Sequence, residues 1–413
     1  MPSDTTRVDV AVIGGGPAGS AAAMRLARGG AKVAVFEAGV RGRDKICGDG
    51  LTPRAVAALD ELGISLEAAH RIAGLRMIAG RQVRELPWPA TDRFPGHGAV
   101  WPRRRLDEAL ISAAEQAGAD VQFSSTALPI IDDGRVVGVT VGEGSSTRRV
   151  NADLVVVAAG AQGAVARAIG AQRVADEPFG LAIRTYVESP RHADDLIEAC
   201  LTMRDEHGTP VPGYGWMFPC GDGTVNIGVG ALSTMKGFRK LNLNTLLASY
   251  RSSVRESWQL GADTERARAW RLPMSVVRRT GPGWAAIGDA AGLVNPMNGE
   301  GIDYGLESGI LIADEFLANP DGATERYDIA VGDRFDRFLR TGRRFAFLIG
   351  HPMILRTGLR MAVGTQSIAN ITLQVMGNLI DGDTPGLAGR VFGATDRVLG
   401  VADPLLRRTR ARA

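Results

Sequence analysis

The sequence predicts a mixed α/β fold in which a parallel-sheet domain is interleaved with an antiparallel-sheet domain and followed by a helical C-terminal unit. Three observations support this prediction. Residues 8–28 run from an apolar strand through a glycine-rich turn into a helix-forming segment, as in a parallel βαβ unit. Residues 179–229 carry alternating and aromatic strands, which are typical of an antiparallel sheet. From Tyr327 onward the pattern is helical.

The first element is the stretch V-D-V-A-V-I-G-G-G-P-A-G at residues 8–19. Gly14, Gly16 and Gly19 stand in G-x-G-x-x-G spacing between the strand and the helix. In such a turn the first glycine permits a sharp bend, and the second lets backbone N–H groups approach a pyrophosphate. The third lets the helix pack closely on the strand. The helix N-terminus then faces the anion with its unpaired N–H groups.

A second apolar strand, residues 32–36, ends at Glu37. A carboxylate at this place can hold ribose hydroxyls and would repel a 2′-phosphate. Strand, glycines, helix, second strand and acid therefore predict a dinucleotide site in a Rossmann-type domain, with Ala18 of the turn among its contacts. The alternative is a glycine-rich turn that holds no ligand.

The following elements continue the parallel-sheet domain. A glycine-rich, charged segment after Glu37 leads into a helix that starts near Pro53. Residues 75–101 form a short excursion of strands, and residues 103–118 return to an amphipathic helix. The continuous apolar run at residues 154–159 suits a buried strand of the parallel sheet.

The antiparallel-sheet domain follows. Phe179–Glu188 alternates, Tyr214–Pro219 is aromatic, Thr224–Val229 is a further strand, and Leu241–Trp258 is a helix that covers them. Residues 284–288 again resemble a strand of the first type, so the two domains are interleaved. We expect residues 1–70, 98–175 and 271–330 in the nucleotide-binding domain, 71–97 and 176–270 in a substrate domain, and 331–413 in the helical unit.

Composition excludes several classes of protein. A hydrophobic content of 45% with 23% charged residues is typical of a soluble globular chain. Cys47, Cys200 and Cys220 have no paired spacing, which favours a reducing compartment and opposes a disulfide or zinc framework. None of the five His residues lies in nucleophile or metal-ligand spacing, so no metal site is expected. No signal peptide is evident, and we expect a cytoplasmic protein.

The charge is unevenly distributed. From Val331 onward the chain has 13 Arg, six Asp and no Lys or Glu, a net charge of +7, so the remainder carries about −4 of the total +3. Basic, apolar helices favour an anionic surface such as the inner face of the cell membrane. A solvated helical face is the alternative. Nucleic acid is not expected, because no aromatic-interleaved basic motif or helix-turn-helix is present.

Residues 361–380 carry no charge and first suggest a membrane span. Their many polar side chains make the segment too polar to cross a bilayer. Ile368, Ile371, Val375 and Leu379 fall on one face, so the segment is predicted to be a packed or surface-lying amphipathic helix.

The second diagnostic stretch is A-A-I-G-D-A-A-G-L-V-N-P-M-N-G-E-G-I-D-Y-G at residues 285–305. Asp289 can accept hydrogen bonds from a flexible polyol, and a helix starting at Ile302 can present its N–H groups to an electron-rich ring edge. The stretch resembles the segment that binds the ribityl chain and isoalloxazine of FAD in the para-hydroxybenzoate hydroxylase fold class. The resemblance implies a glutathione-reductase-like FAD domain, with Pro296, Gly299 and Gly301 as further FAD contacts.

Two further stretches, R-D-K-I-C-G-D-G-L-T-P-R-A-V and P-G-Y-G-W-M-F-P-C-G-D-G-T-V-N-I-G-V-G, resemble the geranylgeranyl reductase family. Within it they are most similar to the actinobacterial reductases of the menaquinone side chain. This resemblance implies an FAD enzyme that reduces isolated C=C bonds of polyprenyl chains. It also implies that Gly48 and Arg103 contact FAD and that Tyr214 and Trp216 line the substrate channel.

One segment departs from the family pattern. Relatives carry an Asp-Gly pair after the 154–159 strand and a Ser shortly beyond, but here Ala159 and Gly163 take the places of the acid and the hydroxyl. That segment supports cofactor contacts in relatives. The electron donor therefore stays open between NAD(P)H and a reduced protein carrier.

Two sets of residues admit a functional and a structural interpretation. Cys47 can donate a proton near the flavin, with Lys45 lowering its pKa, or it can simply fill a tight turn. Tyr214, Trp216 and Phe218 alternate on one strand and share a face, which suits either a channel wall or a packed core.

The favoured function is an FAD-dependent reductase that saturates isolated C=C bonds of a geranylgeranyl lipid or a menaquinone side chain. One alternative is an FAD-dependent monooxygenase or other flavin-dependent tailoring enzyme of secondary metabolism, such as a halogenase. The other is a non-catalytic FAD- and lipid-binding protein.

Overall fold

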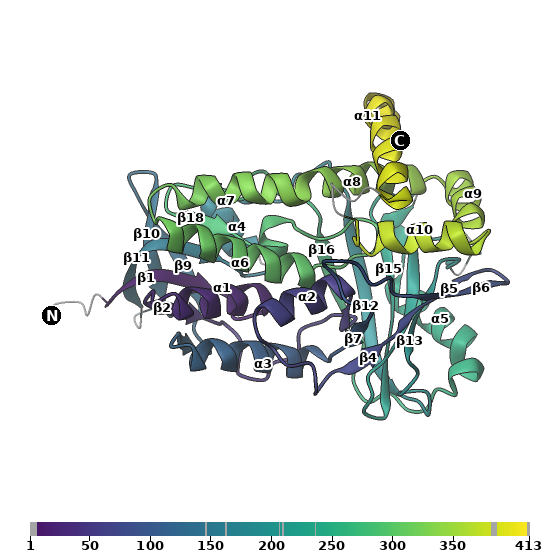
Figure 1. Ribbon diagram of the computed structural model, residues 1–413, viewed down its shortest axis with the longest axis horizontal. Helices are drawn as coiled ribbons and strands as arrows, with labels where there is room; N and C mark the ends of the chain where they lie inside the picture. The colour runs from purple at the N-terminus through teal and green to yellow at the C-terminus, as the bar shows by residue number, and fades with distance from the viewer. Residues whose placement is uncertain are drawn as a thin grey trace.

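The computed structural model describes residues 6–144, 147–161, 163–205, 207–208, 210–235, 237–380 and 386–410. It has the predicted mixed α/β architecture, which is confirmed. The parallel-sheet domain occupies one end of the molecule, and the antiparallel sheet occupies the other (Figure 1). The C-terminal helices lie along one side, from which the last helix projects (Figure 1).

The first sheet has eight strands. Its parallel part is ordered β18-β11-β1-β2-β8, with a β9–β10 hairpin paired to β11 and a short β17 at the edge. Val10, Val12, Val35 and Val155 are fully buried at its centre, because helices cover both faces of a parallel sheet. The strands are β1 (Thr6–Ile13), β2 (Val33–Phe36), β8 (Asp120–Gln122), β9 (Ala127–Asp132), β10 (Arg135–Val141), β11 (Arg148–Val157), β17 (Thr280–Gly281) and β18 (Trp284–Ala286).

Helices enclose this sheet. Helix α1 begins at the glycine turn and packs closely on α6, where the absence of a side chain at Gly309 permits contact with the backbone of Ala18. The helices of this domain are α1 (Pro17–Arg28), α2 (Pro53–Glu61), α3 (Arg103–Gln116), α4 (Gly163–Ile169), α6 (Ile302–Ala318) and α7 (Ala323–Val331).

The second sheet has seven strands in the order β16-β12-β15-β14-β13-β5-β6. The segment at residues 74–87 supplies its β5–β6 edge, and helix α5 (Leu243–Trp258) packs on one face. The expected boundary at residue 271 falls inside β16, and that strand pairs with β12 along its whole length. The strands are β5 (Gly74–Ala79), β6 (Gln82–Pro87), β12 (Phe179–Glu188), β13 (Leu196–Cys200), β14 (Gly213–Pro219), β15 (Thr224–Leu232) and β16 (Arg268–Pro273).

A small three-stranded sheet carries the chain from the glycine-rich segment after Glu37 towards the second sheet. Its central strand β7 pairs with both neighbours, so the loop that ends at β3 is fixed against the start of α3. The strands are β3 (Gly50–Leu51), β4 (His70–Ile72) and β7 (Gly98–Val100).

The C-terminal unit is helical, as predicted. A π-helical turn at Gly332–Asp336 leads into α8 (Arg337–Ile349), followed by α9 (Pro352–Ala362), α10 (Gln366–Met376) and α11 (Leu387–Arg410). Within the described ranges, no helix has both the length and the apolar character needed to cross a membrane. Of the charged residues counted in this unit, Asp381, Asp383 and Arg412 fall outside the described residues.

The prediction of one helix over residues 361–380 is wrong. The segment divides between α9 and α10, and a turn separates them at residues 363–365. The Thr365 side chain accepts a hydrogen bond from the backbone N–H of Ile368 at 3.3 Å, so Thr365 is the N-cap of α10. A capped start explains why an uncharged run nevertheless contains a helix boundary.

Candidate active site

A cavity of about 1180 Å³ lies where the two sheets and the C-terminal helices meet. Its inner end is formed by the glycine turn, the Cys47 loop and the segment around Asp289. The aromatic strand β14 forms a side wall, and helices α8 to α11 surround the outer end.

The glycine turn has the geometry that a pyrophosphate site needs. Gly14 has a φ of +108°, and a Cβ there would lie 2.5 Å from a neighbouring backbone oxygen. A Cβ at Gly19 would lie 1.9 Å from the carbonyl oxygen of Gly14. Gly16 differs, because the nearest atoms to a Cβ there would be guanidinium nitrogens of Arg43 and Arg103, each 3.9 Å away. The open space beside Gly16 is therefore flanked by two cations, which suits an anion.

Glu37 ends β2 and lines the cavity, with a side chain that is largely buried. Its carboxylate accepts hydrogen bonds from the backbone N–H of Gly15 (2.9 Å) and of Gly39 (2.8 Å). The Arg43 guanidinium donates two more, at 2.8 and 3.0 Å. Burial opposes ionisation, but the Arg43 contacts outweigh it and lower the pKa of Glu37. Glu37 is therefore held as a carboxylate that can accept from ribose hydroxyls.

The Cys47 loop is tied to the second sheet by a buried polar network. Asp49, with a φ of +65°, donates its N–H to Cys47 Sγ at 3.3 Å. The Asp49 carboxylate accepts from the Arg103 N–H at 3.1 Å, from the Tyr186 hydroxyl and from Asn226 Nδ2 at 2.8 Å. Asn226 Nδ2 also donates to the carbonyl of Cys47 at 2.9 Å. The loop therefore has a fixed position relative to strands β12 and β15.

Burial governs the protonation states of this loop. It raises the pKa of the Cys47 thiol, against the opposing charge of Arg103. The expectation that the pKa of Cys47 is lowered, with Lys45 as the cause, is therefore wrong. Burial also raises the pKa of Asp49 to about 6, although Tyr186 and Asn226 donate hydrogen bonds to it. Cys47 is thus a thiol near neutral pH, the form that can give up a proton.

Tyr214, Trp216 and Phe218 of β14 all line the cavity. The ring centroids of Tyr214 and Trp216 are 5.8 Å apart, and those of Trp216 and Phe218 are 6.1 Å apart. The Tyr214 hydroxyl donates to the carbonyl of Asn298 at 2.5 Å. The Phe218 ring lies 3.2 Å from the position of a Cβ at Gly48. The structure thus brings the aromatic strand, the Cys47 loop and the turn after Pro296 together.

The opposite face of β14 provides the packed core. Met217 is fully buried with the residues under helix α5, and Gly215 meets the ring of Tyr250 on that helix. The three alternating aromatic residues point to the other side, towards the cavity. Their position favours the channel wall over the core interpretation.

The second diagnostic stretch forms the remaining wall. Strand β18 delivers a 3₁₀ turn, Gly288–Ala291, which places Asp289 at the cavity. Asp289 Oδ1 lies 3.1 Å from the position of a Cβ at Gly301. Helix α6 begins at Ile302 with its first turn beside the same space. The other predicted contacts that line the cavity are Ala18, Gly48, Arg103, Pro296, Gly299 and Gly301.

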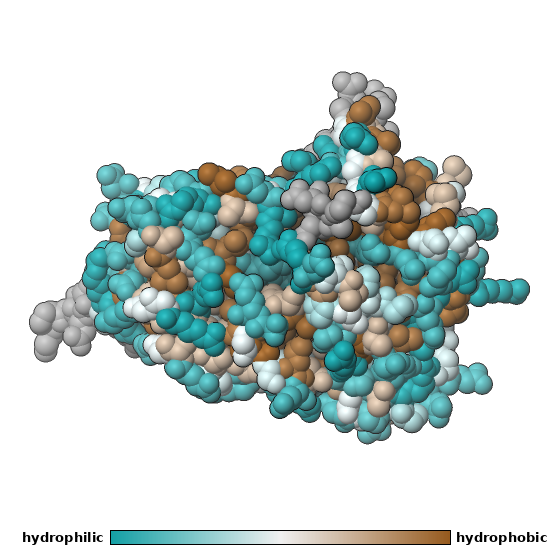
Figure 2. All heavy atoms as spheres, viewed as in Figure 1, coloured by the Kyte–Doolittle hydropathy of each residue, from teal (hydrophilic) through white to brown (hydrophobic). Residues whose placement is uncertain are grey.

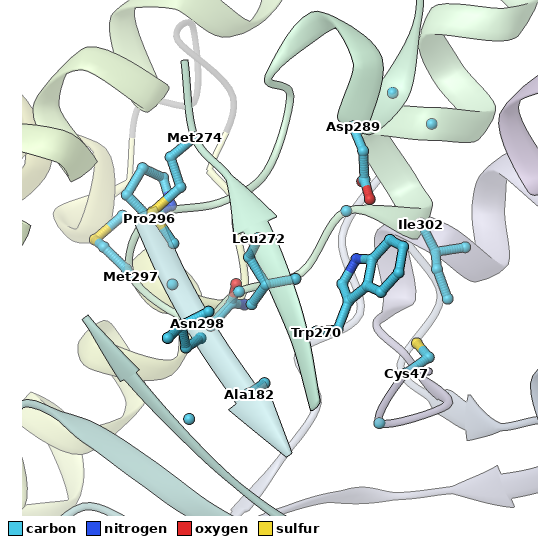
Figure 3. A pocket seen from close by; sticks show the side chains of 18 of the residues that line it. Cys47, Ala182, Trp270, Leu272, Met274, Asp289, Pro296, Met297, Asn298 and Ile302 are labelled. Carbon is cyan, nitrogen blue, oxygen red and sulfur yellow. The ribbon is translucent and has the colours of Figure 1, made fainter. Parts of the chain in front are cut away.

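Two residues at the inner end of the cavity, Trp270 and Arg43, were not singled out from the sequence. Trp270 on β16 lies near Asp289, Ile302 and Cys47 (Figure 3). The ammonium of Lys45 is 4.2 Å from the centroid of the Trp270 ring, and burial lowers the pKa of Lys45. No local pattern marks Trp270, which stands on an edge strand at the assumed domain boundary.

The departure at Ala159 also borders the cavity. Ala159 and Gly160 line it directly after β11. A Cβ at Gly160 would lie 2.9 Å from the ammonium nitrogen of Lys45. The Lys45 ammonium therefore lies against the segment that departs from the expected pattern. Among the described residues, no group of three or more His, Cys, Asp or Glu could hold a metal ion.

Comparisons with known proteins identify the family of this chain. Residues 7–324 match the family described as FAD binding domain. The chain is 39% identical to the menaquinone reductase of Mycolicibacterium smegmatis over 396 residues, 94% of this chain and 95% of that protein. It is 28% identical to the digeranylgeranylglycerophospholipid reductase of Thermoplasma volcanium, over 80% of this chain and 84% of that protein.

Solved structures show the same fold. A geranylgeranyl bacteriochlorophyll reductase-like protein from Thermoplasma acidophilum superposes with a TM-score of 0.78 at 22% identity. The match covers 95% of this chain and 100% of that one. A flavin-dependent brominase gives a TM-score of 0.75 at 17% identity, covering 94% of this chain and 98% of the brominase.

Proposed function

We infer that this chain, which belongs to the geranylgeranyl reductase family of FAD-binding oxidoreductases, reduces isolated C=C bonds in the isoprenoid chain of a lipid. The identity to a menaquinone reductase along almost the whole chain makes a menaquinone side chain the first candidate substrate. A geranylgeranyl lipid is the second, from the archaeal relatives. The similar sequences favour a reductase over a monooxygenase or a non-catalytic lipid-binding protein.

One observation carries this proposal. The space bounded by the nucleotide motifs is continuous with an apolar channel between β14 and the C-terminal helices. A polar dinucleotide and a long hydrocarbon can therefore occupy the same cavity and meet beside Tyr214 and Trp216. An apolar site with few polar groups is what an alkene substrate requires.

The residues present fit FAD. The open space at Gly16 between two guanidinium groups suits the pyrophosphate, and Glu37 suits the adenosine ribose. Asp289 suits the ribityl hydroxyls, and the first turn of α6 suits the ring edge. When bound, FAD supplies the hydride chemistry of the reaction.

The chain's own residues orient the alkene, exclude water and supply a proton. We assign the aromatic wall of β14 to orientation, because three rings offer a flat apolar surface. Cys47 Sγ holds a proton in the inner cavity, since burial raises the pKa of its thiol. Asn226 and Asp49 fix the loop that carries this thiol.

The test uses chemically reduced holoenzyme and menaquinone in detergent micelles. We expect a product heavier by one H₂ in its side chain, detected by mass spectrometry, and reoxidation of the flavin with the same time course. Reoxidation without a saturated product, or a product that has gained oxygen, would contradict the proposal. The same enzyme mixed with NADH or NADPH in a stopped-flow instrument tests direct reduction against the need for a protein carrier.

We also propose that the basic C-terminal helices hold the enzyme on the inner face of the cell membrane. Arg360 on α9 and Arg390 and Arg397 on α11 are exposed. Basic side chains near an anionic leaflet contribute about 1 kcal/mol each to binding. Co-sedimentation with anionic vesicles at increasing salt concentration measures this contribution.

A further inference from the structure

The outer end of the cavity is enclosed by apolar helix faces. On α8, Thr341, Phe345 and Leu348 recur at helical spacing and line it. On α10, Ile368, Ile371 and Val375 do the same. The predicted apolar face of the 361–380 segment is thus turned partly towards the cavity.

Helix α9 presents an apolar face that the protein does not cover. Met353, Thr357 and Met361 are spaced by four residues and all line the cavity. Met353 is nevertheless 73% exposed and Met361 60% exposed. Because Met353 and Met361 both line the cavity and are exposed to solvent, they lie at the mouth of the cavity.

Helix α11 has two apolar faces instead of one. Its inner face packs on α8, where Phe392 stacks on Phe338 at 5.5 Å between ring centroids. Its outer face carries a stripe at spacings of four, seven and three residues, all exposed: Leu387, Val391, Val398 and Val401. Since the inner face accounts for packing on the body, the outer stripe has no structural partner among the described residues.

Both exposed faces border the cavity. Val391 belongs to the α11 stripe and also lines the cavity. Figure 2 shows hydrophobic surface at the base of the projecting α11, on the side of α9 and α10. The stripe therefore leads directly to the opening of the apolar channel.

The charges around this surface favour an anionic bilayer over a protein partner. Arg390 and Arg397 are exposed on α11, and Arg360 is exposed on α9. Asp396, on the inner face of α11, forms an ion pair with Arg337 at 3.0 Å and accepts a hydrogen bond from the Thr341 hydroxyl. An apolar stripe flanked by arginines is the pattern of helices that lie in a membrane interface.

We propose that the outer stripe of α11 (Leu387, Val391, Val398 and Val401) and the open face of α9 (Met353 and Met361) insert into one leaflet of an anionic bilayer. The mouth between them is then a lateral portal, through which a polyprenyl chain passes from the lipid into the cavity without crossing water. This portal rests on the proposed function for its substrate but not for its binding to membranes.

The test compares two triple variants of the full-length holoenzyme. Leu387→Ser, Val398→Ser and Val401→Ser remove stripe residues that do not line the cavity. The control, Val40→Ser, Val277→Ser and Ile329→Ser, changes apolar residues that are also highly exposed (63%, 66% and 64%, against 64%, 67% and 83% in the stripe variant) and lie outside the C-terminal unit. Both proteins are assayed for co-sedimentation with phosphatidylglycerol–phosphatidylcholine vesicles, and for reduction of menaquinone in vesicles and in detergent micelles.

The portal predicts that the stripe variant loses at least about tenfold in vesicle binding and in turnover of vesicle-embedded menaquinone. Turnover in micelles stays at the parent level, and the control behaves as the parent throughout. Parent-like vesicle binding by the stripe variant would overturn the portal, as would a lipid-free dimer of the parent that this variant abolishes. If the parent binds vesicles through the stripe but reduces menaquinone in neither medium, the insertion of the stripe into the bilayer stands and the proposed function fails.

Discussion

The two ends of the cavity differ in the residues that line them and in the contacts that hold those residues. At the inner end, glycines, Glu37 and two arginines surround a space that is fixed by hydrogen bonds of 2.8–3.1 Å. Backbone N–H groups donate several of these bonds. At the outer end, four helices contribute mainly apolar side chains, and several of those side chains are exposed. The comparison teaches that the cofactor end is held by directional contacts, whereas the lipid end is shaped mainly by packing.

Among the variants considered, Gly16→Val is expected to have the largest effect, which is a loss of FAD affinity at the inner end of the cavity. Its backbone has φ −79° and ψ −174°, which any residue adopts, and a Cβ there meets nothing closer than 3.9 Å. The fold is therefore retained while the branched side chain fills the space beside the guanidinium groups. We expect the Kd for FAD to rise at least about a hundredfold, roughly 3 kcal/mol.

The measurement is fluorescence titration of the apoprotein with FAD, together with its Tm. Gly19→Val is the contrasting variant, because its Cβ would lie 1.9 Å from a carbonyl oxygen and must disturb the α1–strand packing. It should lower the Tm of the apoprotein, which Gly16→Val should not. Equal FAD affinity in Gly16→Val and parent would show that the space is not the pyrophosphate site.

Asp49 makes the inner end sensitive to pH. Its pKa is raised from 3.8 to about 6 by burial, so the folded state binds a proton that the unfolded state releases. Stability from this group is present below pH 3.8 and is lost as pH rises towards 6, by an order of magnitude of about 3 kcal/mol. Asp49→Asn should remove this slope.

Urea unfolding of the apoprotein between pH 4 and pH 7, about the window set by these two values, measures the slope. Asp49→Asn also loses an acceptor for Tyr186 and Asn226, so its stability is expected to be lower overall by about 1–3 kcal/mol. The diagnostic quantity is therefore the difference in slope between the variant and the parent, and identical slopes would exclude Asp49 as the titrating group.

The sequence predicts the residues of this site that belong to local motifs, but not those that only tertiary contacts bring to the cavity. Gly14, Gly16, Glu37 and Asp289 are recognisable because each belongs to a local motif in which neighbouring residues fix the chemistry. The Asn226–Asp49 contact joins residues 177 apart, and no short-range pattern announces it. Trp270 was missed for the same reason, since only the pairing of β16 with β12 brings it to the cavity.

The fold was predicted well where hydrophobic periodicity is strong. The buried run of β11 and the alternation of β12 identified two different sheets. The break between α9 and α10 was missed because residues 361–380 contain no proline and no charge. The side chain of Thr365 caps the start of α10. In the sequence, one capping residue is a weaker signal than an apolar pattern that continues through the segment.

Trp216→Ala tests the side wall between the two ends. Trp216 is 5% exposed, and its indole N–H donates to Asn226 at 2.9 Å, while its ring faces the cavity. Removing the ring should lower kcat/KM for long polyprenyl substrates at least about tenfold, roughly 1.4 kcal/mol, with FAD still bound. Kinetics on menaquinone in micelles measure this, and the flavin absorbance of the purified protein confirms cofactor loading.

Tyr214→Phe is the matched control for that wall. It keeps the aromatic surface and removes only the hydroxyl that donates to Asn298 at 2.5 Å. If shape and apolar area orient the alkene, Tyr214→Phe retains most of the activity that Trp216→Ala loses. Unchanged kinetics in Trp216→Ala would remove the ring from the channel.

Thr365→Ala tests the outer end of the cavity and is expected to have the smallest effect of these variants. Thr365 caps α10 by accepting from the Ile368 N–H, and α10 supplies Ile371 and Val375 to the cavity wall. Loss of the cap should destabilise the protein by about 1 kcal/mol, whereas Thr365→Ser, which keeps the hydroxyl, should not. Because α10 lines the outer end of the cavity, a frayed α10 should raise KM for the lipid while the Kd for FAD stays constant. An altered FAD affinity in Thr365→Ala would show that the two ends are mechanically coupled, contrary to the division drawn from their contacts.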